Sequence, residues 1–464
     1  MDIIDADERA AYYASIVQQF SSRTRNQVRS AYNSNGANNT RIKFSTTFRN
    51  VIYDVLISRG YDYTDDTVDW DIMWCDKMYI RAVYSKIYLS NNQFINHYRN
   101  FYELCRKDCL IRNLRKYKKL LLQQCTSDNE RTDILNELSF WPDTYILPTE
   151  YYIFAKSFKD DTHNTTATTQ YIMKPIASSQ GKGIFLFDRL SDISDWKLHI
   201  KSIQYSNINN KRQPISQSVD DDVCERYIVQ RYIDRPLLIG GKKFDMRIYA
   251  LVTSFAPLTV WLYRDGFARF ASTRYSMLNC DISNNLVHLT NVAVQKHGEL
   301  YDGDNTGGKM DLTALKKYLC TVYGEVVTDR AFVGIENIIV HSLRAVSSCM
   351  INDSQSFELY GYDVLLDSEL KPWLIEVNGS PSLTASTQHD KKMKFDLLND
   401  MLNVIDMEKI RVGNEIQMGG FDLLVDKNQR LQKYQRNTVS SYLGNSMYNR
   451  NNNRVNTRRS KCSQ

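Results

Sequence analysis

The segment FELYGYDVLLDSELKPWLIEVNGSPSL, residues 357–383, decides the fold. Residues 361–366 and 373–378 are rich in β-branched, aromatic and aliphatic side chains, and the polar residues 367–372 separate them. Two β-rich runs around a short polar stretch are typical of a β-hairpin. The sequence therefore predicts an antiparallel pair of strands in this segment.

The register of this hairpin decides which side chains share a face. We expect Asp363 to pair with Glu376, because successive side chains of a strand point to opposite faces. The same register pairs Leu365 with Leu374 and Leu366 with Trp373. It gives one apolar face and one polar face: Val364, Leu366, Trp373, Ile375 and Val377 on the first, and Asp363, Glu376 and Asn378 on the second.

The polar face of the hairpin has two possible explanations. Like charges opposite each other destabilise a sheet, so pairing Asp363 with Glu376 makes sense when a cation lies between them. Two carboxylates and the amide oxygen of Asn378 are hard oxygen ligands, which suit Mg²⁺ held together with nucleotide phosphates. The alternative is an ordinary hairpin whose acidic side chains are solvated. The hairpin alone leaves both open.

The composition indicates a globular protein of two or three lobes. The chain has 464 residues, of which 42% are hydrophobic and 24% charged. The acidic N-terminus lacks the order of a signal peptide, and the most apolar region, residues 249–263, is interrupted by polar residues and a proline, so we expect a cytosolic protein without a membrane span. The nine cysteines form no CxxC pair and the seven histidines show no metal-ligand spacing, which predicts reduced thiols and no zinc site.

The positive charge is concentrated at the C-terminus. Residues 427–464 hold nine basic residues and no acidic one, so removing nine from the chain's +6 leaves −3 for the body. This tail and the Asn-rich residues 1–42 have too few apolar side chains to offset the entropy of ordering, which predicts a disordered arm and a basic disordered tail. A nucleic-acid binder would also carry a basic tail, but an acidic body without a nucleic-acid motif argues against it.

The N-terminal third predicts two helices and a strand. Ser45 or Thr46 can cap a helix that ends at Gly60, a strand follows at residues 69–74, and a long amphipathic pattern at 100–122 predicts a helix with a basic face. That face is either a solvated surface or a docking surface for an acidic partner.

The middle of the chain contains a candidate phosphate-binding loop. Residues 171–174 and 183–187 read as strands joined by PIASSQGKG, a small-residue loop with backbone N–H groups and two nearby lysines, Lys174 and Lys182. The loop is not a Walker motif, and a plain hairpin explains it equally well. Residues 203–222 are rich in Asn, Gln, Ser and Asp, which predicts a surface insertion.

Three charged residues follow on a long predicted strand. Residues 226–233, 244–255 and 258–271 read as strands, and alternate spacing puts Lys243, Asp245 and Arg247 on one face. Three charges there need compensation, either from a bound triphosphate or from an internal salt-bridge network. Helices are expected at residues 312–323, capped by Asp311, and at 329–350 and 391–404.

Four motifs in this order resemble the tubulin tyrosine ligase-like family. They are Lys174 with SSQGKG (178–183), VQRYIDRPLLIGGKKFDMRIYALV (229–252), HLTN (288–291), and the hairpin with NGSPSL. The resemblance runs from about residue 43 to residue 425 and is strongest for the polyglutamylase branch. It implies an α+β ATP-grasp fold with mixed and antiparallel sheets, flanking helices and three lobes. We expect the lobes at residues 43–141, 142–236 and 237–426, the last carrying the Mg²⁺ and ATP site.

The resemblance also implies the roles of individual residues. Lys174, Gln180 and Gly181 would contact the phosphates of ATP, the hinge Gln230, Arg231, Tyr232 and Ile233 would hold adenine, Lys243 and Asp245 would hold phosphate and ribose, and Thr290 and Asn291 would approach the triphosphate. Asp363, Glu376 and Asn378 would carry Mg²⁺. Arg269 and Lys309 would grip free L-glutamate, and Arg247 would face the γ-phosphate; Lys174, Arg247 and Glu376 would form the catalytic set.

The activity that the resemblance implies is ATP-dependent glutamate ligation to tubulin tails. ATP would convert an acceptor carboxylate to an acyl phosphate, and the amine of glutamate would displace phosphate. This implies tubulin or microtubules as partners. The protein would lie in the cytoplasm and cytoskeleton, and in a cilium, flagellum or basal body. Whether it needs accessory subunits is left open. Val292 and Ala293 depart from the Tyr and Ser that follow HLTN in many glutamylases, which leaves open the donor and the choice between initiation and elongation. A glycine ligase remains an alternative, and so does an inactive scaffold that binds acidic tubulin tails through the basic helix and tail.

Overall fold

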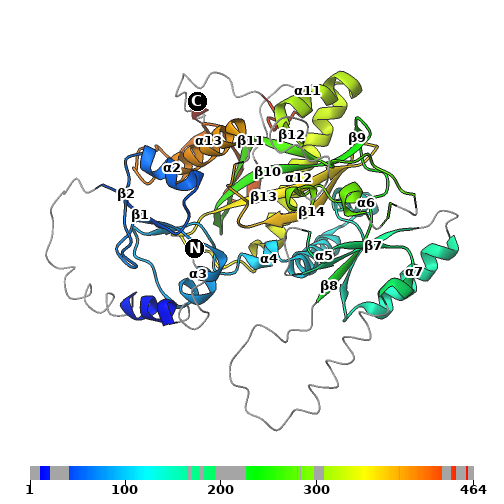
Figure 1. Ribbon diagram of the computed structural model, residues 1–464, viewed down its shortest axis with the longest axis horizontal. Helices are drawn as coiled ribbons and strands as arrows, with labels where there is room; N and C mark the ends of the chain where they lie inside the picture. The colour runs from blue at the N-terminus through cyan, green and yellow to red at the C-terminus, as the bar shows by residue number, and fades with distance from the viewer. Residues whose placement is uncertain are drawn as a thin grey trace, which may run out of the picture.

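The structure is a computed structural model that describes residues 11–20, 41–164, 169–176, 181–193, 226–278, 281–282, 284–296, 308–385, 387–430, 440–445 and 456–457. These residues form an α+β protein with three sheets, which Figure 1 shows as a blue region, a teal region and a larger green-to-orange region. The expected fold class is therefore confirmed. Among the described residues, no helix has the length and apolar character needed to span a bilayer.

The first sheet is parallel and has the order β2-β1-β3-β4. Its strands and helices are β1 (Lys43–Thr46), α2 (Val51–Ser58), β2 (Asp62–Tyr63), β3 (Ile72–Trp74), α3 (Lys77–Ala82), a 3-10 turn (Tyr84–Lys86) and β4 (Phe94–Ile95). Ser45 and Thr46 lie in β1, and Asn50 caps α2 through a bond from the Ile52 N–H. The predicted cap was therefore wrong by one turn.

Residues 11–20 form a helix that packs against the first sheet. Ile16 and Phe20 are buried beside Trp70 and Tyr79. The expectation of disorder was wrong for these ten residues, because three or four well-spaced apolar side chains suffice when a neighbouring surface can bury them. The rest of the expected arm lies outside the described residues.

The second sheet is antiparallel and has the order β5-β8-β6-β7. Its elements are β5 (Thr144–Leu147), α7 (Tyr151–Asn164), β6 (Tyr171–Pro175), β7 (Phe185–Phe187), a 3-10 turn (Leu190–Ile193) and β8 (Tyr227–Arg231). The predicted strand pair around the Gly-containing loop is confirmed. The predicted insertion at 203–222 lies outside the described residues.

The third sheet is the largest and carries the hairpin. Its main path is β14-β13-β10-β11-β16-β15-β18, and the pairs along it are antiparallel. The strands are β9 (Leu238–Ile239), β10 (Lys242–Phe255), β11 (Leu258–Phe270), β12 (Lys309–Asp311), β13 (Glu358–Leu366), β14 (Pro372–Asn378), β15 (Glu415–Met418), β16 (Phe421–Asp426), β17 (Gln429–Arg430) and β18 (Asn456–Thr457).

Helices cover both faces of the third sheet (Figure 1). The helices not yet given are α4 (Tyr102–Cys105), α5 (Lys107–Gln124), α6 (Asp128–Glu137), α9 (Asn285–His288), α10 (Val292–Gln295), α11 (Leu312–Tyr323), α12 (Glu325–Ser347) and α13 (Gln388–Ile405). On one face of the sheet lie α5, α11 and α12, and on the other lie α2 and α13. Met246 and Ile248 of β10 face α5, α11 and α12, while Tyr249 and Leu251 face α2 and α13. Because of this alternation, the odd-numbered residues at the start of β10, Lys243, Asp245 and Arg247, line a pocket.

The predicted helix at residues 100–122 is interrupted. Arg106 has extended backbone between α4 and α5, with φ −83° and ψ 124°, so the chain changes direction there. Asp311 precedes α11 but makes no side-chain cap bond, and α12 begins at Glu325, four residues before the expected start.

The hairpin contains a β-bulge that the sequence did not indicate. Asp363 pairs with Glu376 as expected, but Val364 pairs with Leu374 and Leu365 with Trp373, so Ile375 is an extra residue on β14. The predicted partners of Leu365 and Leu366, and the predicted core position of Ile375, were therefore wrong. Leu374 is buried in the core instead. A bulge next to a site re-aims the side chains beside it.

Part of the predicted disordered tail is ordered. Beyond β17, residues 440–445 pack on α11 and α12, where Lys316 Nζ donates to the carbonyl oxygens of Ser441 at 2.8 Å and Leu443 at 3.1 Å. Ser441 Oγ donates to Glu336 Oε1 at 2.6 Å, and Leu443 is 1% exposed. The tail prediction was wrong for these residues, because buried polar partners stabilise them rather than a long apolar run. It was also wrong for β17 and β18, which pair with β16 and β15.

Candidate active site

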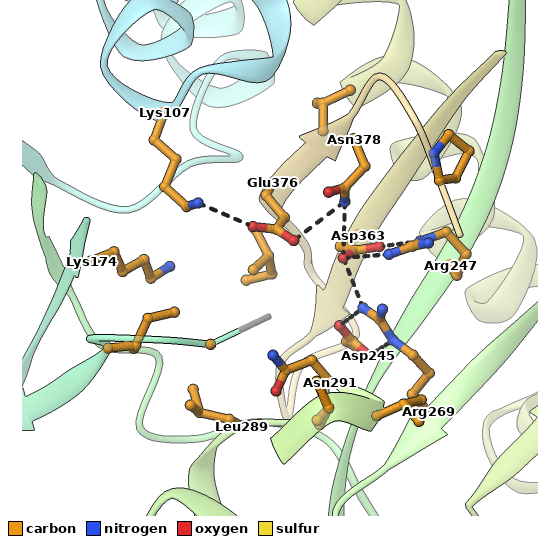
Figure 2. A pocket seen from close by; sticks show the side chains of 18 of the residues that line it. Lys107, Lys174, Asp245, Arg247, Arg269, Leu289, Asn291, Asp363, Glu376 and Asn378 are labelled. Carbon is orange, nitrogen blue, oxygen red and sulfur yellow. Dashed lines mark hydrogen bonds and ion pairs between the residues drawn. The ribbon is translucent and has the colours of Figure 1, made fainter. Parts of the chain in front are cut away.

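A pocket of about 920 Å³ lies between the second and third sheets. Its walls come from β6 and β8 on one side and from β10, β11, β13 and β14 on the other, with α3, α5, α10 and the segment after β14 around its rim. Figure 2 shows side chains from these elements pointing into one space. A concave pocket lined by converging charged groups is the default candidate for an active site.

Register brings the charged residues of the third sheet into two adjacent rows. In one row, Asp245 of β10 pairs with Arg269 of β11, which pairs with Lys309 of β12. In the other, Arg247 of β10 pairs with Asp363 of β13, which pairs with Glu376 of β14. Residues two apart on a strand share a face, so both rows line the pocket, as the odd-numbered spacing predicted.

The arginines in these rows are paired with buried carboxylates. Arg247 Nε and Nη2 donate to Asp363 at 2.5 and 3.0 Å, and Arg269 Nη2 donates to Asp363 Oδ2 at 2.8 Å. Arg269 also donates through Nε to Asp245 Oδ1 at 2.8 Å, with a second bond from Nη2. Burial alone would raise the pKa of the Asp363 carboxyl, but the two guanidinium groups hold that pKa well below its usual value.

Glu376 and Asn378 stand beside Asp363 at the end of the hairpin. Asn378 Nδ2 lies 3.4 Å from Asp363 Oδ2 and 3.3 Å from Glu376 Oε1, and Lys107 Nζ lies 3.4 Å from Glu376 Oε2 (Figure 2). The side chain of Glu376 is 32% exposed, whereas that of Asp363 is 3% exposed. Glu376 is therefore the more accessible carboxylate of the pair.

These side chains fit a divalent cation by their chemistry. Within the described part of the chain, no group of three His, Cys, Asp or Glu side chains is arranged to hold a metal. A cation here would be held by Asp363, Glu376 and the amide oxygen of Asn378 after rotation of the amide, with the remaining ligands from nucleotide phosphates. Asn291 adds a second sign of a polar ligand, because its buried Oδ1 lines the pocket region and has no hydrogen-bond partner in the structure.

Lys174 approaches the pocket from the second sheet. Its Nζ donates to Gln230 Oε1 at 2.8 Å, and Gln230 Nε2 donates to Thr144 Oγ1 at 2.9 Å. Burial, and then the neighbouring charge of Lys107, lower the pKa of Lys174 to about 8. No carboxylate of the described residues lies within ion-pair distance of Lys174. A bound anion would supply the missing charge.

Lys243 is a second buried lysine in the pocket. Its Nζ donates to Tyr232 OH at 2.8 Å and to the carbonyl oxygen of His288 at 2.9 Å. Burial, and then Lys174, lower the pKa of Lys243 to about 7, and burial with Lys243 lowers the pKa of His288 to about 4. Neutral His288 therefore accepts through Nδ1 from Tyr232 OH at 3.0 Å, with Nε2 donating to the Asp281 carbonyl at 3.0 Å.

The loop and hinge positions lie at the same pocket. Gly181 has φ +77°, and a side chain there would meet Asn291 Nδ2 at 2.8 Å, so the loop approaches α10 at a point that only glycine fits. Thr290 and the predicted hinge residues also line the pocket: Gln230, Arg231, Tyr232 and Ile233. Gln180 lies outside the described residues.

The two residues predicted to bind the amino-acid donor are neighbours. Lys309 is the register partner of Arg269, lies 4.7 Å from the centre of the Phe267 ring, and contacts Asp390 Oδ2 at 2.8 Å. Lys394 of α13 contacts the same carboxylate at 3.0 Å and lines the same end of the pocket. This end is therefore rich in fixed cations.

The structure adds residues that the sequence reasoning did not place in the site. Lys107 was read as part of a solvated basic face, yet it reaches Glu376, and Lys394 was read only as part of a helix. Helical spacing could have separated Lys107 from the exposed Arg112 and Lys116, which lie five and nine residues further on and therefore on another face of α5. Nothing in the local pattern marks Lys394, because its place depends on how α13 packs.

Comparison with known proteins agrees with this geometry. The chain is 42% identical to the probable tubulin polyglutamylase TTLL9 of Rattus norvegicus over 83% of this chain and 84% of that protein. It is 41% identical to the probable tubulin polyglutamylase ttll-9 of Caenorhabditis elegans over 86% and 88%. It is 40% identical to the probable alpha-tubulin polyglutamylase Ttll1 of Tetrahymena thermophila over 84% and 94%. A sequence model of the Tubulin-tyrosine ligase family matches residues 86–412. The chain belongs to the tubulin-tyrosine ligase family.

Proposed function

We propose that this protein is an ATP-dependent ligase that adds glutamate to glutamate side chains in the C-terminal tails of tubulin. The observation that carries the proposal is a single pocket lined by Asp363, Glu376 and two buried lysines, Lys174 and Lys243, that have no carboxylate partner among the described residues. Such a pocket suits a polyanion and its metal. Three relatives named as tubulin polyglutamylases support the choice of acceptor.

ATP would lie between the two sheets. In this proposal the hinge holds the adenine through Gln230, Arg231, Tyr232 and Ile233, and Asp245 holds the ribose. The phosphates are held by Lys174, Lys243, Gln180, Gly181, Thr290 and Asn291. Because Arg269 already holds Asp245, a ribose hydroxyl would share that carboxylate with the guanidinium group. Mg²⁺, held by Asp363, Glu376 and Asn378, would supply charge neutralisation of the phosphates.

The residues of the chain would then position and stabilise the reacting groups. An acceptor carboxylate attacks the γ-phosphorus, ADP leaves, and an acyl phosphate forms. Lys174, Lys243 and Arg247 offset the charge on the transferred phosphoryl group, which needs fixed cations rather than a protein nucleophile. The α-amine of glutamate attacks the acyl carbon, phosphate leaves, and an amide bond remains.

The donor would bind at the cationic end of the pocket. Arg269 and Lys309 would hold the carboxylates of free L-glutamate, because paired carboxylates call for fixed cations in fixed geometry. Val292 and Ala293, which depart from many glutamylases, line the same pocket and offer the incoming amino acid no side-chain polar group. The enzyme would act on microtubules of the cytoplasm and of a cilium, flagellum or basal body, with accessory subunits where they are needed.

The test is a ligation assay with the purified full chain, microtubules, ATP and Mg²⁺. Labelled glutamate and labelled glycine are offered separately, and mass spectrometry locates the modified tail. We expect glutamate incorporation and no glycine incorporation; the reverse result would make the protein a glycine ligase. Glu376→Gln should lower the rate at least about 100-fold while leaving the circular dichroism spectrum unchanged. Microtubule binding without incorporation of either amino acid would identify an inactive scaffold.

A further inference from the structure

A buried histidine connects a carboxylate to a serine at the pocket. His97 Nδ1 lies 2.8 Å from Glu358 Oε1, and His97 Nε2 lies 3.3 Å from Ser380 Oγ. The side chains of His97 and Glu358 are 1% and 0% exposed, whereas Ser380 is exposed and lines the pocket. Glu358, His97 and Ser380, which we call the relay, therefore run from the core to the pocket.

Three separate parts of the fold hold the relay in place. His97 follows β4, whose Ile95 exchanges backbone hydrogen bonds with the segment before β13 at 2.9 and 3.1 Å. Glu358 is the first residue of β13, and Ser380 lies two residues after the end of β14. Between them, a side chain at Gly379 would meet Glu358 Oε1 at 2.8 Å and Cys105 Sγ at 2.9 Å. The close packing of Gly379 therefore fixes the backbone next to Ser380.

The partners of Glu358 assign the tautomer of His97. Glu358 Oε2 accepts from the Tyr98 backbone N–H at 3.2 Å and from the Tyr360 hydroxyl at 2.9 Å. A carboxylate surrounded by donors leaves the proton of His97 on Nδ1, where it is donated to Glu358 Oε1. His97 Nε2 is then an acceptor directed at the Ser380 hydroxyl. An imidazole oriented by a carboxylate and facing a hydroxyl is an arrangement suited to proton transfer.

The other titratable groups near His97 do not compete for that proton. Burial raises the pKa of the Cys105 thiol well above its usual value, and burial does the same for Tyr98 and Tyr360, so these groups are neutral. Lys77 lies 5.7 Å from the centre of the Phe101 ring, which stands 5.4 Å from the His97 ring. The carboxylate of Glu358 is the charge in direct contact with the imidazole.

The proposed reaction contains a step that needs such a group. The α-amine of free glutamate is an ammonium group at neutral pH, and it must lose a proton before its nitrogen can attack the acyl carbon. With phosphates bound, the lysines and arginines that hold phosphate and donor carboxylate are already charged, so they cannot accept that proton. We propose that Ser380, His97 and Glu358 remove it.

The transfer balances without a further reactant. The ammonium N–H passes its proton to Ser380 Oγ as the Ser380 O–H proton passes to His97 Nε2, so serine is restored and the imidazole becomes an imidazolium. The buried Glu358 carboxylate compensates the new charge. The freed nitrogen pair forms the C–N bond as the C–O bond to phosphate breaks, and the imidazolium returns its proton to solvent or to the departing phosphate.

The deciding experiment separates amine deprotonation from acyl phosphate formation, and it rests on the proposed ligase function. Hydroxylamine is largely unprotonated at neutral pH, so it traps an acyl phosphate as a hydroxamate without help from a base. In His97→Asn, the asparagine amide replaces Nδ1 against Glu358 but offers nothing to Ser380. At pH 7 we expect glutamate incorporation to fall about 100-fold or more, with hydroxamate formation on the tubulin tail within about twofold of the wild type.

A pH profile gives a second readout. Because the glutamate amine loses its own proton as pH rises, the defect of His97→Asn should shrink between pH 7 and pH 9.5, and Ser380→Ala should behave in the same way. A structural defect would persist across that range. Loss of hydroxamate in parallel with glutamate incorporation, or a defect independent of pH, would overturn the relay.

A matched control comes from another buried histidine. His341 Nε2 contacts Glu137 Oε1 at 2.9 Å and its Nδ1 lies 3.3 Å from Tyr117 OH, away from the pocket residues. His341→Asn should leave the ratio of glutamate product to hydroxamate unchanged. If the wild type forms neither product, the ligase proposal fails and the relay falls with it; if the wild type forms both and His97→Asn does too at pH 7, the relay alone is refuted.

Discussion

The pocket holds two kinds of buried cation, and they differ in what surrounds them. Arg247 and Arg269 are fully engaged by Asp363 and Asp245 within the third sheet. Lys174 and Lys243 are buried to a similar degree, but their described partners are an amide, a hydroxyl and a carbonyl group. The arginines are compensated by carboxylates of the fold itself, whereas the lysines have no carboxylate partner among the described residues.

This difference separates residues that stabilise the fold from residues that we expect to act mainly in ligand binding. A buried ion pair that loses one partner leaves an uncompensated charge, so removing a carboxylate damages the fold. A buried lysine without a carboxylate already lowers its own pKa, so its removal costs little until an anion is present. The following four predictions test that division.

The largest effect is expected for Asp363→Asn. It removes the carboxylate shared by both arginines and should lower the free energy of unfolding by about 3–5 kcal/mol, measured by urea denaturation. Asp422→Asn is the matched control, since Asp422 pairs with one arginine, Arg264, away from the pocket. An Asp363→Asn protein no less stable than Asp422→Asn would show that the arginines do not depend on their shared partner.

Lys174→Met should separate binding from stability. Loss of charge-assisted contacts worth about 1.5–3 kcal/mol should weaken ATP binding roughly 10- to 100-fold, measured by calorimetry. The free energy of unfolding of the ATP-free protein should change by no more than about 1–2 kcal/mol, because only the Gln230 acceptor loses its donor. Lys159→Met on the exposed side of α7 is the control and should change neither quantity. A destabilisation as large as that of Asp363→Asn would contradict the division.

Proton uptake on ATP binding is a smaller effect of the same kind. In the free protein the pKa values are about 8 for Lys174 and about 7 for Lys243, and bound phosphates favour the charged form and raise both. At pH 8, ATP binding should therefore take up about one proton, and affinity should fall about tenfold as pH rises from 7.5 to 8.5. Calorimetry in buffers of different ionisation enthalpy measures the uptake. Proton release would mean that the lysines are not the phosphate ligands.

The smallest effect is expected from the basic tail. Replacing Arg450, Arg454, Arg458, Arg459 and Lys461 with Gln removes five positive charges but keeps the ordered segment 440–445 and β18, which pairs with β15. Microtubule affinity should fall a few-fold at low salt and the loss should vanish at high salt, because exposed charges are screened. Cosedimentation measures this, and equal affinity at low salt would make these charges irrelevant to docking. ATP affinity, which depends on the buried lysines, should stay unchanged.

The sequence predicted which charged side chains share a face better than it predicted which of them form ion pairs. Alternation along a strand is a local property, so the common face of Lys243, Asp245 and Arg247 and the pairing of Asp363 with Glu376 were predictable. Which charges neutralise one another depends on how β10, β11 and β13 align, and residues more than 100 positions apart meet there. Of the two alternatives posed for the charged strand, the internal network is confirmed for Asp245 and Arg247. Lys243 lies outside that network, and its compensation by a bound triphosphate stays a prediction.

The errors in the fold have a similar origin. The interruption at Arg106, the ordered residues 440–445 and the helix at 11–20 depend on surfaces supplied by distant parts of the chain. Local composition describes how much apolar surface a segment has, but not how well a neighbour can cover it. His97 and Lys107 were missed for the same reason, since only the packing of α4 and α5 against the hairpin brings them to the pocket.

The bulge at Ile375 has a consequence for how this chain can change in length. Ile375 has no partner on β13, so Leu374 and Glu376 keep their faces relative to Val364 and Asp363 whether or not it is present. A deletion of this one residue removes the bulge and leaves Glu376 and Asn378 on the pocket side, whereas a deletion of Val377 moves one of them to the opposite face. Ile375 is therefore a position of this hairpin at which the loss of one residue is compatible with an intact site.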